Sequence, residues 1–267
     1  MTDSGLAGQI AAAETYEAVF VPALFREWGP RLVAAARISP GQQVLDVASG
    51  TGVLARAAAA TAGPGGAVTG VDRNPGMLAV ARRLAPGITW REAVAEALPF
   101  PDRSFDAVVS QFGLMFFEDR VAALREMWRV LRPGGHLAVA VWASLDDTPA
   151  YAAEVELLER LAGPAAADAL RAPFVLGDRD EFAGLFERAG IPLTGAVTHT
   201  GTARFPSIRS VVETDLRGWL PLVGVPLAED VIQRILAEAE VVLRPYRAHD
   251  GSARFESPAH IATARRS

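Results

Sequence analysis

The sequence predicts an α/β protein with a mostly parallel sheet and helices on both of its faces. Strand-like runs at 43–47 and 67–72 alternate with helical patterns near 53–61 and 76–84. The first run leads into the glycine turn Ser49-Gly-Thr-Gly52, and the second ends on the carboxylate of Asp72. A turn without side chains lets a ligand approach the backbone closely, and an acid at that strand end can accept hydrogen bonds from ribose hydroxyls. The three observations together predict a nucleoside-binding βαβ unit.

The same alternation continues to about residue 143. We expect further strands at 88–91, 105–111 and 136–142, and a helix near 119–131. Before the first strand, residues 9–38 are predicted to form two helices interrupted near Trp28-Gly29-Pro30, with Tyr16, Phe20 and Leu24 along one apolar face. Asn74 and Pro75 are typical of a helix start, as an N-cap followed by a first-turn proline.

Beyond residue 143 the pattern is less regular. Helices are expected at 149–163 and 178–189, a strand near 193–204, and a helical insertion at 207–243 broken around Pro221 and Pro226. The tail segments 250–255 and 259–264 are predicted to close the sheet as antiparallel edge strands. We therefore expect an N-terminal helical lid at 1–38, a Rossmann-like core at 39–143, and a C-terminal part at 144–267. In that last part, helices would cap the carboxyl edge of the sheet and select the substrate.

Composition excludes several classes of protein. The chain has 267 residues, 50% of them apolar and 21% charged, and contains no cysteine, so disulfides and thiolate metal sites are ruled out. A net charge of −5 without a basic stripe argues against nucleic acid as a partner. No apolar run reaches the ~18 residues of a membrane span, and the N-terminus lacks a signal-peptide pattern. We expect a cytoplasmic protein with no metal, membrane or nucleic-acid partner. Its oligomeric state cannot be read from the sequence.

The glycine turn differs from a dinucleotide fingerprint. It reads Asp46-x-Ala48-x-Gly50-x-Gly52, without the third glycine at the spacing that NAD-binding proteins use. Four later segments accompany it, and together they cover roughly residues 40–143: 71–77 (VDRNPGM), 95–102 (AEALPFPD), 104–109 (SFDAVV) and 126–135 (EMWRVLRPGG). In order and spacing these segments resemble the class I S-adenosylmethionine (SAM) dependent methyltransferases. The resemblance is to the small-molecule group related to the ubiquinone/menaquinone-type C-methyltransferases.

The resemblance implies a sheet with a seventh, antiparallel strand, SAM as cofactor, and S-adenosylhomocysteine as product. It also implies a set of cofactor-binding residues. Asp46 would hold the SAM ammonium, and the turn Ala48, Ser49, Gly50 and Gly52 would pass close to the carboxypropyl and ribose portions. Asp72 would bind both ribose hydroxyls. The remaining expected contacts are Arg73 and Met77 beside the adenine, Ala95 and Glu96 at its edge, Gln111 near the methyl group, and Tyr16 and Trp28 from the lid.

Two positions depart from the family pattern. Ala48 stands where the family usually has glycine, and Val94 where it often has aspartate or asparagine bonding the adenine amino group. Valine cannot make that bond, so we expect somewhat weaker adenine recognition. Simpler interpretations also stay open. Asp46 can merely organise the turn, Met77 can be a core residue, and Tyr16 and Trp28 can belong to a helix packed on the sheet.

The predicted activity is transfer of a methyl group to an oxygen, carbon or nitrogen atom of a small organic molecule, by in-line displacement. Such a reaction depends mainly on holding the acceptor and the methyl group in line. A general base is needed only if the acceptor must lose a proton, and His199 is a weak candidate for it. The alternatives are a SAM-binding protein that transfers no methyl group, an NAD-type oxidoreductase, and an RNA methyltransferase.

Overall fold

The computed structural model describes residues 3–267 and contains one seven-stranded sheet with the order β3-β2-β1-β4-β5-β7-β6. The strands are β1 (Gln43–Val47), β2 (Ala67–Asp72), β3 (Thr89–Glu92), β4 (Phe105–Gln111), β5 (Leu131–Trp142), β6 (Leu193–Phe205) and β7 (Ala253–Arg265). The first five pair in parallel, whereas β7 runs antiparallel to both of its neighbours. The predicted α/β class with a mostly parallel sheet is confirmed.

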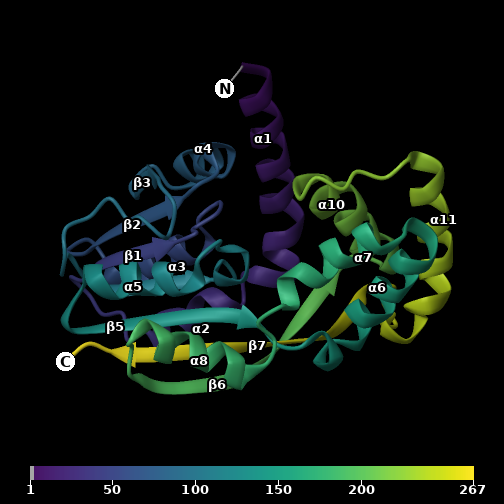
Figure 1. Ribbon diagram of the computed structural model, residues 1–267. Helices are drawn as coiled ribbons and strands as arrows, with labels where there is room; N and C mark the ends of the chain where they lie inside the picture. The colour runs from purple at the N-terminus through teal and green to yellow at the C-terminus, as the bar shows by residue number, and fades with distance from the viewer. Residues whose placement is uncertain (1–2) are drawn as a thin grey trace.

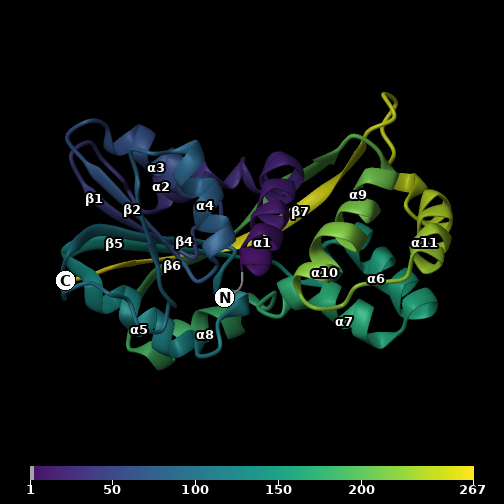
Figure 2. The ribbon, with the colours of Figure 1, turned by 90° about the horizontal axis from the view of Figure 1, so that it is seen from above.

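Helices cover both faces of the parallel strands. α2 (Trp28–Ala35), α3 (Val53–Ala62) and α4 (Pro75–Leu84) lie on one side, and α5 (Arg120–Val130) and α8 (Arg179–Ala189) lie on the other (Figure 2). The start of α4 follows the predicted chemistry, because the Asn74 side chain accepts hydrogen bonds from the Gly76 and Met77 backbone N–H groups and Pro75 occupies the first turn.

The C-terminal tail differs from our prediction in two respects. It forms one continuous strand, β7, and this strand lies between β5 and β6, so β6 is the edge of the sheet. β5 pairs only with residues 259–265 of β7, whereas β6 pairs along its whole length down to Ala253. The outer half of β6 and β7 therefore extends past the sheet as a two-stranded ribbon toward the cap (Figure 2). The position of β7 inside the sheet could not be predicted from its sequence, because the residues that β7 buries depend on the strands that pair with it on both sides.

The cap is a group of helices beyond the carboxyl end of β5, seen at the right of Figure 1. It contains α6 (Pro149–Ala162), α7 (Pro164–Arg171), α9 (Ile208–Thr214), the π-helix η5 (Asp215–Trp219), α10 (Leu220–Leu222) and α11 (Glu229–Val242). Short 3-10 turns join the cap to the sheet and its helices: η3 (Leu145–Asp147) lies between β5 and α6, η4 (Ala172–Phe174) between α7 and α8, and η6 (Arg244–Tyr246) between α11 and β7. A further one, η2 (Leu114–Phe116), lies between β4 and α5 of the core. α7 was not predicted, because Gly163 and Pro164 read as the end of a helix and also serve as the start of the next.

The N-terminal segment lies between the sheet and the cap (Figure 1). α1 (Asp3–Thr15) continues into a π-helix, η1 (Tyr16–Phe25), and the break before α2 falls at residues 26–27, close to the predicted interruption. Pro22 lies inside η1 and cannot donate an N–H to the helical ladder. The wider π-helical turn changes which side chains share a face, so Tyr16 and Phe25, nine positions apart, stack at 5.3 Å between ring centroids.

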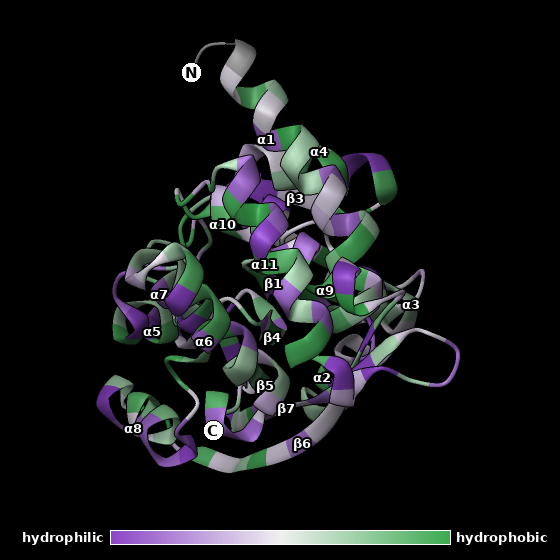
Figure 3. Ribbon diagram, turned by 90° about the vertical axis from the view of Figure 1, so that its right-hand side faces the viewer, coloured by the Kyte–Doolittle hydropathy of each residue, from purple (hydrophilic) through white to green (hydrophobic). Residues whose placement is uncertain are grey.

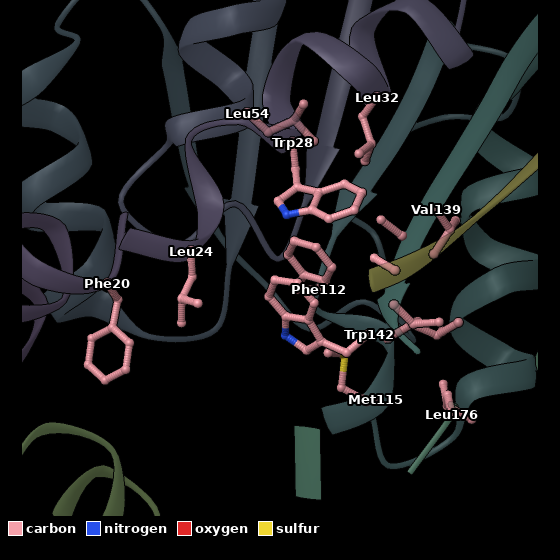
Figure 4. Packing of buried hydrophobic residues seen from close by; sticks show 14 of the residues in the cluster. Phe20, Leu24, Trp28, Leu32, Leu54, Phe112, Met115, Val139, Trp142 and Leu176 are labelled. Carbon is pink, nitrogen blue, oxygen red and sulfur yellow. The ribbon is translucent and has the colours of Figure 1, made fainter. Parts of the chain in front are cut away.

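The core is continuous from the sheet into the cap. The outer helices carry hydrophobic and hydrophilic residues on separate sides, as the green and purple bands of α5 and α8 indicate (Figure 3). At its centre, Phe112 stacks on Trp142 with 3.7 Å between ring centroids, and Trp28 meets both rings edge-on (Figure 4). This aromatic cluster fixes the ends of β4 and β5, where the functional cavities begin.

No helix within residues 3–267 is long and apolar enough to cross a membrane.

Candidate functional site

The glycine turn joins β1 to α3 in a backbone conformation that few residues adopt easily. Ala48, Gly50 and Gly52 all have positive φ, at +58°, +54° and +92°. Gly50 faces an open cleft, and the nearest atom to a side chain placed there would be Tyr16 Cε1 at 3.9 Å. Gly52 instead packs against the Trp90 ring, where an added Cβ would lie 2.4 Å from Cη2. The two glycines therefore serve different purposes, since only Gly50 leaves room for a ligand.

Asp72, at the end of β2, is held rigidly by backbone groups. Its Oδ2 accepts a hydrogen bond from Gly50 N–H and its Oδ1 accepts one from Asn74 N–H, each at 2.8 Å. Burial raises the pKa of this carboxyl, and the hydrogen bonds from Asn74 and Gly50 oppose that shift. Each carboxylate oxygen can accept a further hydrogen bond. Asp72 lines the cleft, so both oxygens are positioned to accept a pair of neighbouring hydroxyls.

Asp46 lies one layer deeper, in β1, with 1% of its surface exposed. Burial raises the pKa of Asp46 well above its usual range, and the charge of Asp72 raises it further. Neither of its carboxylate oxygens has a hydrogen-bond partner within the described residues, nor do the nearby hydroxyls of Ser49, Thr51 and Ser110. Buried polar groups normally find partners. Each of these atoms would need a bound ligand or an ordered water to complete its hydrogen bonds.

The opposite end of the cleft is shaped for a flat apolar group. Met77, Val94 and Ala95 line it, and Val94 is 44% exposed. Glu96 also lines the cleft, but its Oε1 accepts hydrogen bonds from the Glu118 and Asp119 N–H groups at 3.0 and 3.4 Å. Arg73 is solvent-exposed and forms an ion pair with Glu118 at 3.6 Å. Glu96 thus ties the rim of the cleft to the start of α5.

Gln111 and Tyr16 close the cleft from the side of the N-terminal segment. The Gln111 amide donates to Phe25 O at 3.1 Å, while its buried carbonyl oxygen has no partner within the described residues. The Arg56 guanidinium donates to Glu17 and to Thr51 O, which anchors η1 to the glycine turn. Burial and the charge of Asp72 raise the pKa of Tyr16, so its hydroxyl stays protonated beside the cleft.

A second cavity, which we call the chamber, adjoins the cleft and has a volume of about 110 Å³. Its walls are largely aromatic and come from the N-terminal segment, the strand ends and the cap. Tyr16, Phe112, Phe116, Trp219 and Leu222 line both cavities, so the chamber and the cleft share a wall. The residues that line the chamber alone include Phe20, Phe25, Trp142, Tyr151, Phe174 and Asp215.

Nine of the residues predicted to bind the cofactor line the cleft: Tyr16, Ala48, Gly50, Asp72, Arg73, Met77, Ala95, Glu96 and Gln111. Asp46, Ser49 and Gly52 lie behind it. Trp28 is fully buried and lines neither cavity; it supports Phe112 from the core. His199 is exposed on the edge strand β6, opposite Ala259 of β7, and lines neither cavity.

The sequence interpretation missed most of the chamber. Phe20 and Leu24 were read only as one face of a helix, and Trp142 only as a strand end. Asp215 carried a usable signal, because an acid between buried residues of an apolar helical face, Val212 and Leu216, is unusual without a role.

The fold is that of a Rossmann-like α/β protein, a class in which ligands bind at the carboxyl ends of the parallel strands, where the cleft lies. Residues 45–139 match the model of the methyltransferase domain family. The ubiquinone/menaquinone biosynthesis C-methyltransferase UbiE of Xanthomonas campestris is 46% identical over 122 residues, 43% of this chain and 48% of that protein. The chain thus spans about half the length of this relative.

Solved structures extend the similarity of the fold to the rest of the chain. The YcgJ protein of a Bacillus species has a TM-score of 0.57 at 20% identity, over 90% of this chain and 99% of that one. An N-methyltransferase of Haemonchus contortus, solved with S-adenosylhomocysteine, has a TM-score of 0.59 at 16% identity, over 97% of this chain and 58% of that one. At these identities the likeness shows the fold alone.

Residues 45–139 therefore resemble a methyltransferase domain, and the UbiE relative that matches this part of the chain is a C-methyltransferase. SAM is the cofactor of this family, and the cleft fits it. At Gly50 no side chain blocks a close approach to the backbone. The two oxygens of Asp72 are held rigidly and can accept hydrogen bonds from the ribose hydroxyls. The buried carboxylate of Asp46 has no partner within the described residues and can receive the ammonium group.

Proposed function

We propose that the protein transfers the methyl group of SAM to a small organic molecule bound in the chamber. The observation that supports this most is the shared wall of Tyr16, Phe112, Phe116, Trp219 and Leu222 between the cleft and the chamber. Because the two cavities adjoin along these residues, an acceptor in the chamber would lie next to a cofactor in the cleft, where its reacting atom can contact the methyl group. Phe116 and Trp219, which come from the core and the cap, approach to 5.4 Å between ring centroids there.

Each predicted contact of the cofactor keeps its own role in this proposal. Asp72 accepts hydrogen bonds from the two ribose hydroxyls, and Asp46 offers a negative charge to the ammonium, directly or through water. Met77 and Val94 hold the adenine between apolar surfaces, and Ala95 N–H donates to a ring nitrogen. Gln111 and Tyr16 lie where the cleft meets the chamber, so they border the region of the reacting methyl group.

When bound, SAM supplies an electrophilic methyl group on a positively charged sulfur, which becomes neutral as the methyl group leaves. The protein need not protonate that leaving group. Its residues hold the acceptor in line, and the aromatic walls exclude water from the reacting centre. No side chain of the cleft is required as a base unless the acceptor atom carries a proton to be removed.

The acceptor is selected by residues outside the part that matches the family model. Trp219, Leu222, Tyr151 and Phe174 lie in the cap or next to it, beyond residue 139. The similarity to UbiE covers 43% of the chain, so its name does not define the acceptor here. We propose an acceptor with a largely apolar or aromatic body, methylated on oxygen, carbon or nitrogen.

Calorimetric titration with SAM and with NADH tests the cofactor assignment. We expect micromolar SAM binding and no response to NADH. Labelled SAM is then incubated with the protein and a panel of apolar phenols, enols and amines, and transfer of label is measured. NADH binding without SAM binding would overturn the proposal. Tight SAM binding with no transfer to any member of a broad panel would favour a SAM-binding protein without methyl transfer.

A further inference from the structure

Two buried carboxylates, Glu154 and Asp215, have no use in the proposed reaction, and one of them, Asp215, lies in the wall of the chamber. Asp215 is the first residue of the π-helix η5, is 3% exposed, and lines the chamber. Its Oδ2 has no hydrogen-bond partner within the described residues. Glu154, on α6, is fully buried, and neither of its carboxylate oxygens has a partner within the described residues. Glu154 does not line the chamber itself, but it lies close enough to Asp215 for the charge of Asp215 to act on it. Three acceptor atoms are thus left unsatisfied in or behind one side of the chamber wall.

These carboxylates also lack an opposite charge. Burial raises the pKa of Glu154 well above its usual range, and the charge of Asp215 raises it further. Burial raises the pKa of Asp215 to about 8. No basic side chain of the described residues lowers either value. The nearest arginine in sequence, Arg217, is turned toward the surface, where it pairs with Glu213 and Glu229 at 3.2 and 2.7 Å.

A purely structural role explains the pair poorly. Apolar residues of similar size at the same places would avoid the cost of removing two carboxyl groups from water without a partner. Another buried polar side chain of the cap does have a partner: the Thr214 hydroxyl, next to Asp215, donates to Ser210 O at 2.5 Å. The unsatisfied oxygens therefore point to a ligand that brings its own hydrogen-bond donors.

We propose that the Glu154–Asp215 pair binds a protonated amine of the acceptor molecule, an inference that rests on the proposed function and narrows its substrate class. An ammonium group carries three donors and a positive charge, so on binding it displaces a proton that the raised pKa values otherwise keep on the pair, and its N–H groups satisfy the unpartnered oxygens. Tyr151, Phe174 and Trp219 add aromatic faces that attract cations and cover an apolar body.

The pair lies away from the cleft, so the amine would bind at a different place from the reacting methyl group. Asp215 lines the chamber but not the cleft, whereas Trp219, one helical turn later, lines both. The amine is thus an anchor, and the methyl group goes to another part of the molecule that lies against the shared wall. Asp215 and Glu154 are binding residues in this account and take no proton from the reacting atom.

Two probes of the same shape test the proposal: 4-phenylbutylamine and 4-phenylbutan-1-ol, titrated into the full chain at pH 7 by calorimetry. We expect the amine to bind at least tenfold more tightly than the alcohol, as for a charged hydrogen bond worth about 1.5 kcal/mol or more. Asp215→Asn should lower amine affinity about tenfold and leave alcohol affinity within about twofold. Glu154→Gln should act in the same direction.

Glu213→Gln is the matched control, because Glu213 is a nearby carboxylate that already pairs with arginines at the surface. It should change neither affinity. Equal or tighter binding of the alcohol, an amine preference that survives both variants, or no binding of either probe would overturn the proposal. The wild-type comparison needs no variant, so a folding defect cannot conceal the result. Micromolar SAM binding with methyl transfer only to neutral acceptors would leave the proposed function intact and reject the amine site alone.

Discussion

The cleft and the chamber share a wall yet are built in different ways. The cleft takes most of its lining from residues 47–117, where strand ends and short turns follow one another along the chain. The chamber takes its lining from residue 12 to residue 257, from two π-helices, the core and the cap. The cleft presents rigid polar groups to a ligand of fixed chemistry. The chamber presents aromatic faces and the carboxylate of Asp215, which suits selection of a particular acceptor.

The two cavities differ in which parts of the sequence encode their ligand specificity. Parallel strands bring their carboxyl ends to one edge whatever the surrounding sequence, so a short motif suffices to make the cleft. The chamber requires packing between segments distant in sequence. Gly218 of η5, for instance, lies against Phe20 of η1, where an added Cβ would be 3.0 Å from the ring. Four measurements test this contrast between the cleft and the chamber.

Gly52→Ala should destabilise the fold by about 3 kcal/mol, through strain at positive φ and overlap with Trp90. Gly41→Ala is the control, because Gly41 has a φ of +85° but no atom within 4 Å of an added Cβ. It should cost about 1 kcal/mol. Urea denaturation of both variants measures the difference. Equal losses would mean that the Trp90 contact adjusts freely and that the turn is less rigid than its packing indicates.

Asp72→Ala should weaken SAM binding tenfold or more, about 1.5–3 kcal/mol, because it removes a carboxylate acceptor. Binding of a chamber probe should stay within about twofold, since Asp72 does not line the chamber. Calorimetry with both ligands measures the pair of effects. Asp72→Asn is the companion variant, because its amide oxygen can still accept a hydrogen bond from Gly50 N–H. Unchanged SAM affinity in both variants would remove Asp72 from the ribose site.

The Glu154–Asp215 pair should make the cap sensitive to pH. The pKa of Asp215 is about 8 in the folded protein and near 3.8 when unfolded, so the folded state holds its proton more tightly. The stabilisation this gives is complete below about pH 4 and is lost as the pH rises toward 8. Asp215→Asn should therefore raise the free energy of unfolding at pH 8.5 by about 2 kcal/mol, with little effect at pH 5. Urea denaturation at both pH values measures this, and a variant whose stability follows wild type across the range would contradict it.

Val94→Asp should tighten SAM binding several-fold, the effect of about 1 kcal/mol for one hydrogen bond to the adenine amino group. Val94→Ala is the control for loss of the apolar contact and should bind slightly more weakly than wild type. Calorimetry on the three proteins gives the order of affinities. Weaker binding by the aspartate variant than by the alanine variant would mean that the pocket has been rebuilt around valine.

The sequence predicted the parallel part of the fold well. Strands 43–47, 67–72 and 105–111 have the expected bounds, and Asn74 caps α4 as its motif indicates. Such features depend on local chemistry: apolar alternation, a capping side chain, a proline in the first turn. The family motifs also depend on local sequence, because a strand end and the turn after it are only a few residues apart.

The sequence was enough to predict the fold class, the alternation of the first five strands with helices, and the short motifs that line the cleft. Only the tertiary structure decided that β7 lies inside the sheet, that Gly52 serves Trp90 while Gly50 faces the cleft, and that Trp28 supports the core. It also decided the chamber and its carboxylate pair, because Glu154 and Asp215 lie 61 positions apart in the chain. Local preferences act over one or two turns of chain, whereas a cavity depends on which distant side chains pack together and which polar groups that packing leaves without partners.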